Sequence, residues 1–390
     1  MPWKEKTMEE NRKEFVERVL SHEKSKSALC KEYGISRPTG DKWIKRYQNG
    51  ETMSDQSRAP FKTANRISSE MEQLIVERRM AEPAIGARKQ RRMLINEGYE
   101  DLPCASTFNA VYKRNNLITP EASAASTPTK RFEKKYPNEM WQCDFKGYYK
   151  TLDGVEVHPL SVIDDYSRFC LSAEAMENEQ FTGVKEEFKK LFKTYGMPFS
   201  ILCDNGNPWG ASQSGALTTF DIFMMEHGVL VMHIKPKTPR TQGKVERFNG
   251  VFKQERLKFC IPENFEDAQN QRNEYRNFYN HQRPHAALDY ECPSEHYEKS
   301  EIEYREDIPL WDYCAEGEVR KIKHTGYLTF GGHGFYLSES MANKIVCVVP
   351  TEKDGIFDIV FRQFRIARLS LHDNMIISRR VYLRKGDPRD

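Results

Sequence analysis

The sequence predicts a multidomain protein with two helical modules, an α/β core and a small C-terminal β-barrel. Apolar residues recur at helical spacing in two stretches before residue 118, and short apolar strands alternate with helical patterns between residues 139 and 300. Short strands separated by Gly, Asn and Asp-Gly turns follow from about residue 319. A chain of 390 residues is long enough for about three domains. The expected segments are helical modules at 1–52 and 66–118, a basic linker at 119–138, the core at 139–300 and the barrel at 315–390.

The first module has the pattern of a helix-turn-helix DNA-binding domain. Residues 27–36 predict a helix, a turn at Gly34 and a new helix cap at Ser36. Trp43 gives the next helix an apolar side, and Gly50 ends it. Because the last helix of such a motif enters the major groove, its polar side chains are candidate DNA contacts. A three-helix bundle without a ligand would show the same pattern. The candidates are Arg37, Thr39, Lys42 and Lys45, and Gly40 is expected to be exposed beside them.

The second module repeats this arrangement. Pro83 ends its first predicted helix, and a strongly basic helix follows from Gly86 to Gly98. Residues 103–114 predict a further recognition helix, so the two modules together could bind an extended DNA site. The expected DNA contacts are Arg88, Lys89, Arg91, Ser106, Thr107, Lys113 and Arg114.

The linker at 119–138 contains three prolines and a run of Ser, Ala and Thr, which disfavour a packed core. Lys130 and Arg131 add positive charge. Two interpretations stay open here: a solvated tether, or a strap that neutralises DNA phosphates along a groove.

The core places an acid in each of three apolar segments. Asp144 lies in a predicted strand, Asp204 ends the predicted strand 199–203, and Glu246 lies in the first turns of a predicted helix at 241–259. An acid in a buried strand is costly unless its charge is compensated. Mg²⁺ compensates it well, because it takes hard oxygen ligands from a few carboxylates and from substrate phosphates. Two strand acids and one helix acid can hold two ions about 4 Å apart, as in in-line phosphoryl displacement.

Other core elements follow from the same patterns. We expect strands at 140–149, 155–164, 169–174 and 229–233 and helices at 179–195 and 217–227. Asp164 and Asp165, which precede Tyr-Ser-Arg at a strand end, are interpreted as a turn with capping roles and are left out of the acid triad. Cations crowd around Glu246; such residues usually form a solvated face, but beside a metal site they are placed for DNA phosphates. They are Lys235, Lys237, Arg240, Lys244 and Arg247.

Four motifs follow one another through the core: Trp141-Gln-Cys-Asp-Phe, Val162-Ile-Asp-Asp-Tyr-Ser-Arg, Asp204-Asn-Gly and Thr241-Gln-Gly-Lys-Val-Glu-Arg-Phe-Asn. Their order and spacing resemble those of retroviral-type integrases and bacterial insertion-sequence transposases, most closely the insertion-sequence-481 group. The segment 279–288 with Cys292-Pro after it resembles the end of such cores. The 42 positions from Asp204 to Glu246 exceed the usual spacing, and we expect the excess in the small-residue stretch 210–215.

The resemblance implies a ribonuclease-H-like core and a DNA transposase. Such an enzyme binds the terminal inverted repeats of an insertion sequence, cleaves the strand at the element end and joins the freed 3′-hydroxyl to target DNA. Asp144, Asp204 and Glu246 would be catalytic and would hold two Mg²⁺ or Mn²⁺ ions. A dimer or tetramer on double-stranded DNA is implied, because element ends are paired. The resemblance also implies a C-terminal barrel that contacts DNA or protein, although a purely structural tail stays open.

Composition and charge exclude several other classes. No apolar run approaches the roughly 20 residues of a membrane span, and the N-terminus lacks the apolar stretch of a secretory signal. The nine cysteines include no Cys-x-x-Cys pair, which disfavours a disulfide framework or a structural zinc site. We therefore expect a bacterial cytoplasmic protein that associates with the nucleoid.

Charge is unevenly distributed along the chain. Residues 1–138 contain 27 Lys and Arg against 19 Asp and Glu, whereas the remainder is net negative within a total of +3. A basic front suggests nucleic-acid binding, although a solubilising surface would give the same balance. Two alternatives to a transposase stay open: a metal-dependent nuclease without joining activity, and a domesticated DNA-binding regulator, which the intact acid triad disfavours.

Overall fold

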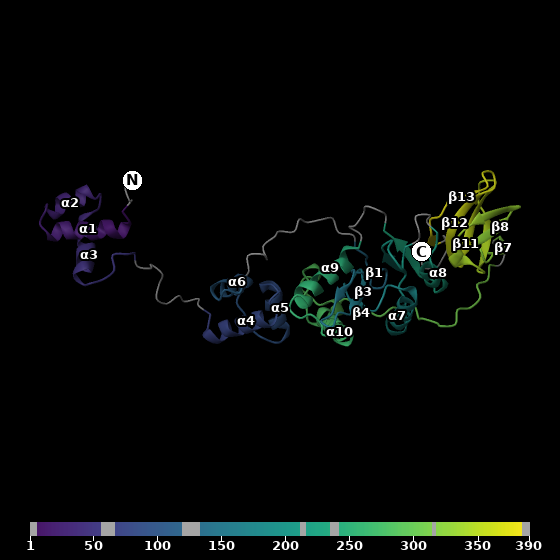
Figure 1. Ribbon diagram of the computed structural model, residues 1–390, viewed down its shortest axis with the longest axis horizontal. Coiled ribbons are helices and arrows are strands. Elements are labelled where there is room, and N and C mark those ends of the chain that lie inside the picture. The colour runs from purple at the N-terminus through teal and green to yellow at the C-terminus, as the bar shows by residue number, and fades with distance from the viewer. Residues whose placement is uncertain are drawn as a thin grey trace. The chain divides into compact units, whose positions relative to one another are not determined.

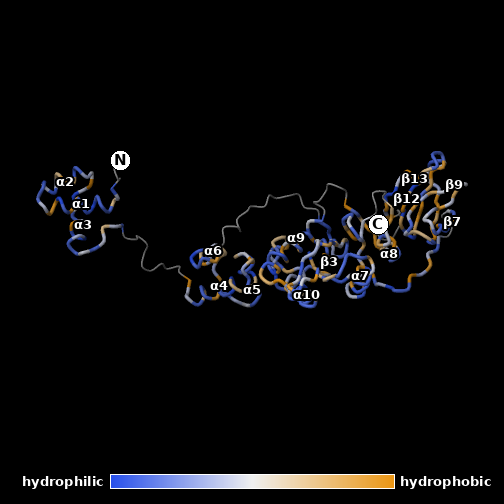
Figure 2. Tube along the Cα trace, in the orientation of Figure 1, coloured by the Kyte–Doolittle hydropathy of each residue, from blue (hydrophilic) through white to orange (hydrophobic). Residues whose placement is uncertain are grey.

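The computed structural model describes residues 6–55, 67–118, 133–210, 216–234, 242–313 and 317–383. The chain divides into two compact units, Met1–Ser68 and Ser69–Asp390 (Figure 1). Apolar and hydrophilic stretches alternate along both units in Figure 2. Among the described residues, no helix is long and apolar enough to cross a membrane.

The described residues of the first unit form three helices with side-chain N-caps, of which the sequence predicts the one at Ser36. Thr7, Ser25 and Ser36 each accept a backbone N–H of the helix that follows. Gly40 is buried rather than exposed, because an added Cβ would lie 2.9 Å from the Cys30 Sγ and 3.1 Å from the Phe15 ring. The helices are α1 (Met8–Leu20), α2 (Lys26–Glu32) and α3 (Arg37–Gln48).

The second unit begins with another three helices, α4 (Ser69–Ala81), α5 (Ala87–Asn96) and α6 (Ala105–Arg114). They share an apolar cluster with the core: Ile85 and Met93 pack with Phe248 and Tyr275. Arg256 of the core also forms an ion pair with Glu82, at 3.0 Å between Nη1 and Oε2. One surface of this helical module is therefore buried against the core.

The described core sheet has six strands joined by three antiparallel pairings and two parallel ones, as in the ribonuclease-H-like fold. β1 pairs antiparallel with β3, β3 pairs antiparallel with β2 and β4, and β5 lies parallel between β1 and β6. The predicted strands are confirmed, except that the stretch predicted at 140–149 forms two strands. The strands are β1 (Trp141–Phe145), β2 (Tyr149–Lys150), β3 (Glu156–Asp164), β4 (Cys170–Met176), β5 (Ser200–Cys203) and β6 (Leu230–His233).

Helices cover both faces of this sheet. On one face, Phe188 of α7 (Phe181–Tyr195) and Phe220 of α8 (Thr219–Glu226) pack on Trp141 and Cys143 of β1. On the other face lie α9 (Gly243–Phe252) and α10 (Phe265–His281), and α9 continues into a π-helical turn at Lys253–Leu257. Alternation along β1 therefore directs Gln142 and Asp144 toward the α9 face. Short 3₁₀ turns occur at Ala286–Leu288, Pro293–Glu295 and Glu339–Met341.

The C-terminal region consists of β-sheets, as predicted, but a closed barrel is not confirmed. The described pairings give an open path β13-β12-β11-β10-β7, with β14 beside β12 and a separate β8–β9 hairpin. Leu328 and Phe335 of the hairpin pack on Val346 and Ile359 of the larger sheet, so the two sheets share one apolar core. Strand patterns indicate a β-rich region but do not specify whether the edge strands meet. The strands are β7 (Glu318–Lys321), β8 (Tyr327–Phe330), β9 (His333–Tyr336), β10 (Ile345–Pro350), β11 (Ile356–Phe361), β12 (Phe364–Ser370), β13 (Met375–Ser378) and β14 (Tyr382–Leu383).

Candidate active site

The sheet places two of the three predicted acids on neighbouring parallel strands. Asp144 lies on β1, and Asp204 directly follows β5. The register of these strands pairs Gln142 with Leu202, so Asp144 and Asp204 fall at equivalent positions at the same edge. Adjacent strands lie only about 4.8 Å apart, which brings the two carboxylates together. Glu246 lies in the first turn of α9, on the face of the sheet to which Asp144 points.

Among the described residues, few donors compensate the charges of the three acids; Asp204, for example, accepts the Gly206 backbone N–H at 3.0 Å. Burial, the Asp204 carboxylate and, less strongly, the Glu246 carboxylate raise the pKa of Asp144 to about 6, although Lys146 opposes this shift. Asn249 of α9 donates only a long hydrogen bond to Asp144, 3.4 Å from Nδ2 to Oδ2. Asp144 is 9% exposed, whereas Glu246 is exposed. The result is a concentrated negative charge that opens to solvent at Glu246.

Side chains that flank the acids hold α9 against the sheet. Gln242, just before α9, donates from Nε2 to the Cys143 carbonyl at 2.6 Å, next to Asp144. Asn249 accepts a hydrogen bond of 2.7 Å from the Ser161 hydroxyl of β3. The sequence analysis did not identify Gln242, Asn249 or Gln142 as site residues. The available signal was a buried polar residue beside a predicted acid, in a stretch that is otherwise apolar.

A Cys-His-Asp cluster supports the loop that carries Asp204. His233 Nε2 lies 2.9 Å from an Asp221 oxygen, and Nδ1 lies 3.2 Å from the Asp204 carbonyl and 3.5 Å from the Cys203 sulfur. Burial lowers the pKa of His233, but its hydrogen bonds to Asp221 and Cys203 outweigh burial and raise it to about 11. Cys203 is fully buried, and burial raises the pKa of its thiol. The cluster therefore anchors β5 and β6 and is unsuited to thiolate chemistry.

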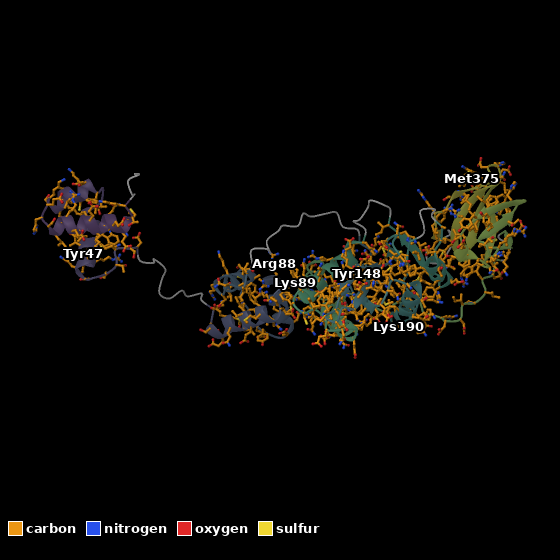
Figure 3. The ribbon with its side chains drawn as sticks, viewed as in Figure 1. Tyr47, Arg88, Lys89, Tyr148, Lys190 and Met375 are labelled. Atoms are coloured by element: carbon orange, nitrogen blue, oxygen red, sulfur yellow. The ribbon has the colours of Figure 1, made fainter. Side chains whose placement is uncertain are left out.

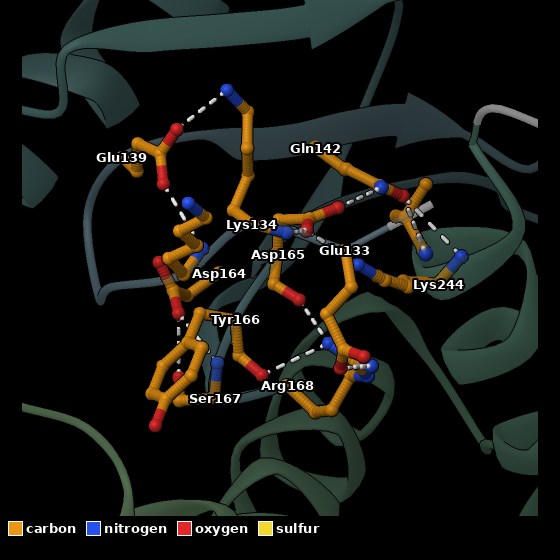
Figure 4. Close-up of polar contacts among 12 residues, drawn as sticks. Glu133, Lys134, Glu139, Gln142, Asp164, Asp165, Tyr166, Ser167, Arg168 and Lys244 are labelled. Atoms are coloured by element: carbon orange, nitrogen blue, oxygen red, sulfur yellow. Dashed lines mark hydrogen bonds and ion pairs between the residues drawn. The ribbon is translucent and has the colours of Figure 1, made fainter. Parts of the chain in front are cut away.

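Asp164 and Asp165 are also fully buried, but their carboxylates are well supplied with donors (Figure 4). Asp164 accepts the Asn138 N–H at 2.7 Å and both the N–H and the hydroxyl of Ser167, at 2.8 and 2.7 Å. This geometry is the capped turn that the sequence predicts. Asp165 differs, because its partners lie outside the turn: Gln142 Nε2 donates to it at 2.7 Å, and Lys244 forms an ion pair with it.

The three acids fit a divalent cation by their chemistry. Carboxylate oxygens are the hard ligands that Mg²⁺ prefers, and the raised pKa of Asp144 marks a place where positive charge would stabilise the protein. Within the described residues, no three His, Cys, Asp or Glu side chains lie close enough together to hold an ion as they stand. The acids would therefore have to draw closer to share one.

The predicted DNA contacts of the first unit lie on the outer side of α3. Arg37, Lys42 and Lys45 are exposed, and Thr39 is half-buried. Arg37 donates to the Ser27 hydroxyl at 2.7 Å, which leaves the rest of its guanidinium accessible. These cations therefore form one accessible surface on the last helix of the motif.

The second module uses several of its predicted contacts for structure instead. Lys89 is half-buried, and burial together with Arg283 lowers its pKa to about 7, so it is poorly placed for DNA. Arg91 donates to the Pro103 and Leu102 carbonyls, at 2.8 and 3.3 Å. Arg114 is paired with Glu72. Sequence alone did not reveal which side of α5 faces the core.

The remaining predicted contacts divide into accessible, structural and undescribed residues. Arg88, Ser106, Lys113 and Arg247 are exposed, and Thr107 is half-buried; Figure 3 labels Arg88 and its neighbour Lys89. Lys244 forms an ion pair with Asp165, and its assignment to DNA stays a prediction. Lys130, Arg131, Lys235, Lys237 and Arg240 lie outside the described residues.

Comparison with known proteins identifies two kinds of domain in the chain. Residues 11–61 match the helix-turn-helix domain model. Residues 134–239 and 227–293 match two models that are each described as an integrase core domain. The strands β1 to β6 and the three acids lie within the two integrase core matches.

Curated relatives of the chain are insertion-element proteins. It is 29% identical over 163 residues to the insertion element IS407 uncharacterized 31.7 kDa protein of Burkholderia multivorans, a match that covers 41% of this chain and 55% of the relative. It is 25% identical over 151 residues to the insertion element IS476 uncharacterized 39.2 kDa protein of Xanthomonas euvesicatoria, covering 39% and 42%. The chain thus spans about half the length of these relatives. Neither finding names the insertion-sequence-481 group, so that assignment stays a prediction.

Solved structures that resemble the chain include retroviral proteins. The HTLV-2 integrase catalytic core domain in complex with magnesium is 21% identical, with a TM-score of 0.32 over 42% of this chain and 98% of that one. A chain of the simian T-cell lymphotropic virus intasome in complex with PP2A regulatory subunit B56 gamma is 16% identical, with a TM-score of 0.37 over 72% and 96%. From the domain matches and the sheet topology, the chain contains a helix-turn-helix domain and an integrase core domain with a ribonuclease-H-like fold.

Proposed function

We propose that this protein is the transposase of a bacterial insertion sequence. It binds the terminal inverted repeats of the element, cleaves the strand at the element end and joins the freed 3′-hydroxyl to target DNA. The observation that supports the proposal is the position of Asp144 and Asp204 at equivalent places on neighbouring strands of an integrase core sheet, with Glu246 on the helix that covers the same face.

Asp144, Asp204 and Glu246 would hold two Mg²⁺ or Mn²⁺ ions, which would activate water or a 3′-hydroxyl and stabilise the charge that develops on the phosphate. The protein's own contribution is positioning. β1 and β5 fix the two aspartates at equivalent register, and α9 brings Glu246 to them from the side. Gln242 and Asn249 hold α9 in that place through the Cys143 carbonyl and the Ser161 hydroxyl.

DNA binding is assigned to both helical modules. In the first, exposed Arg37, Lys42 and Lys45 would neutralise phosphates or reach base edges from α3. In the second, Arg88 and Arg92 line a cavity of about 630 Å³ together with Ala105, at the start of α6. Helix N-termini and guanidinium groups both favour phosphate, so this cavity suits the DNA backbone. Lys130, Arg131, Lys235, Lys237 and Arg240 would extend these contacts.

The assembly that we propose is a dimer or tetramer on DNA, because two element ends must be held together for joining. It would act on chromosomal DNA in the bacterial cytoplasm. The chain covers only about half of each matched relative, so the DNA sequences that it binds and the assembly that it forms are both part of the proposal.

The test uses the full chain with labelled duplexes that end in the repeats of its own element, a target plasmid and Mg²⁺. We expect a nick at the element end and a joined product in which the labelled end is linked to the plasmid. Cleavage without joined product would support the nuclease alternative. Specific binding with neither product would support the regulator, and absence of specific end binding would contradict all three.

A further inference from the structure

Asp165 connects three segments that meet behind the candidate active site. Its carboxylate is fully buried and accepts the Lys134 backbone N–H at 2.8 Å, from the segment that precedes β1. It also accepts the Gln142 side-chain amide of β1 at 2.7 Å and pairs with the Lys244 ammonium of α9. Figure 4 shows these three partners converging on one carboxylate. None of them belongs to the turn that follows β3.

The turn itself does not need Asp165. Asp164 alone supplies the acceptors for the Ser167 N–H and hydroxyl and for the Asn138 N–H. Lys244 and Asp165 form this ion pair largely out of water, since their side chains are 13% and 0% exposed. A buried ion pair is weak evidence for stability, and such pairs are better explained by the geometry that they enforce.

The geometry enforced here is that of the first turn of α9. The side-chain Oε1 of Gln142 accepts the backbone N–H groups of Lys244 and Val245, at 3.3 and 3.4 Å. It therefore acts as the N-cap that α9 lacks, since Gln242 at the cap position makes no side-chain cap hydrogen bond. Asp165 orients the Gln142 amide and holds the Lys244 side chain, so two links run from one carboxylate to the turn that contains Glu246.

We propose that Asp165 is a positioning residue that sets the approach of Glu246 to Asp144 and Asp204 through Gln142 and Lys244. The inference rests on the proposed function, because it assumes that Glu246 must reach the strand acids to share a metal ion. Residues behind metal ligands orient them, and changing such residues typically weakens metal binding roughly 10- to 100-fold.

The matched pair of variants is Asp165→Asn and Asp164→Asn in the full chain. Both residues are fully buried and adjacent, but only the Asp165 carboxylate contacts the Gln142 side chain of β1 and the Lys244 side chain of α9. In Asp165→Asn we expect the Mn²⁺ dissociation constant, measured by titration, and the metal concentration for half-maximal end cleavage each to rise roughly 10- to 100-fold. Cleavage at saturating Mn²⁺ should recover much of the wild-type rate. In Asp164→Asn both metal constants should stay within about threefold of wild type.

A readout that needs neither metal nor activity is amide hydrogen exchange of the peptide that covers α9 in the metal-free protein. Asp165→Asn should accelerate exchange there, and Asp164→Asn should not. Gln142→Met keeps the Asp165–Lys244 pair but removes the cap, and it serves the same test if Asp165→Asn does not fold. It should raise the metal constants in the same direction by a smaller factor.

Equal metal constants and equal α9 exchange in wild type and Asp165→Asn would overturn the inference, as would equal changes in the two Asp→Asn variants. Failure of the proposed function would give a different result. In that case the wild type neither cleaves nor joins, while α9 exchange still reports whether Asp165 fixes the helix.

Discussion

The acids at the end of β3 and those near the end of β1 differ in their hydrogen-bond partners, although burial raises the pKa of both Asp164 and Asp144. Asp164 pairs in register with Trp141 at the start of β1, whereas Asp144 lies near the end of the same strand. Asp164 and Asp165 are surrounded by short N–H and O–H donors and a lysine. Asp144 has one long hydrogen bond and two neighbouring carboxylates.

This difference separates structural acids from functional ones better than burial does. Asp164 and Asp165 are more deeply buried than Asp144, and Asp204 and Glu246 are more exposed still. A charge that the protein itself satisfies is part of the fold. A charge that it gathers and leaves unbalanced is available for a ligand of opposite sign. The predictions below test that distinction at four sites.

The largest effect should come from removing the divalent ion. In EDTA both end cleavage and joining should be abolished, while specific DNA binding persists, because the helical modules do not depend on the acids. Ca²⁺ should support binding with little chemistry, because its larger and looser coordination shell fits two-metal geometry poorly. Gel assays of cleavage, joining and binding in parallel check this. Full activity in EDTA would show that the three acids do not act through a metal.

Glu246→Gln should have the next largest effect. The amide is nearly isosteric and Glu246 is exposed, so the unfolding temperature should change little. Loss of its charge should lower both end cleavage and the joining of pre-cut ends by about 10³-fold, the size expected when a charge that acts in the transition state is removed. Survival of joining with loss of cleavage would contradict a single site for both steps. End binding by the variant is the control.

Asp164→Asn should shift stability more than chemistry. An amide nitrogen directed at the Ser167 or Asn138 N–H would leave a buried donor unsatisfied, which costs about 1–3 kcal/mol. We expect a lower unfolding temperature and cleavage within about tenfold of wild type at a temperature where the variant is folded. A fully inactive but folded Asp164→Asn, beside an active Glu246→Gln, would mean that the triad has been assigned to the wrong carboxylates.

The sequence predicted the strands of the core closely because each is a short apolar run bounded by turn residues. β5, for example, was expected at 199–203 and occupies Ser200–Cys203. Helix α10 was not predicted, because it buries polar side chains such as Arg272 and Asn280 that interrupt the apolar pattern. Closure of the C-terminal strands into a barrel also depends on long-range pairing, which strand patterns do not specify.

The site was predictable only where one residue signals its own role. An acid at the end of a buried strand is such a signal, as for Asp204. The role of Asp165 depends on Gln142 and Lys244, which are 23 and 79 positions away and meet it only in the folded sheet and helix. Likewise, the basic stretch of α5 reveals its charge but not which of its cations face the core. Lys89 and Arg91 were assigned to DNA for that reason.

Lys89 offers the smallest and most specific test, because it is a half-buried cation whose pKa the fold lowers. Burial, Arg283 and Arg247 lower its pKa to about 7, against about 10.4 in an unfolded chain, although Glu255 opposes the shift. Between these values the unfolded state binds more protons than the folded state, so the contribution of Lys89 to the free energy of unfolding increases with pH. Below pH 7 the folded protein carries the full cost of the buried charge.

Lys89→Met should therefore raise the unfolding temperature of the full chain by about 2–4 °C at pH 6.5, and this gain should disappear as the pH approaches 10. Thermal unfolding of variant and wild type at several pH values measures the difference between their unfolding temperatures. The contributions of the other titrating groups cancel in this difference. Arg88→Ala is the matched control: Arg88 is the exposed neighbour, so its loss should weaken DNA binding without a pH-dependent change in stability. Equal gains at every pH, or weaker end binding by Lys89→Met than by Arg88→Ala, would mean that Lys89 is a charged DNA contact after all.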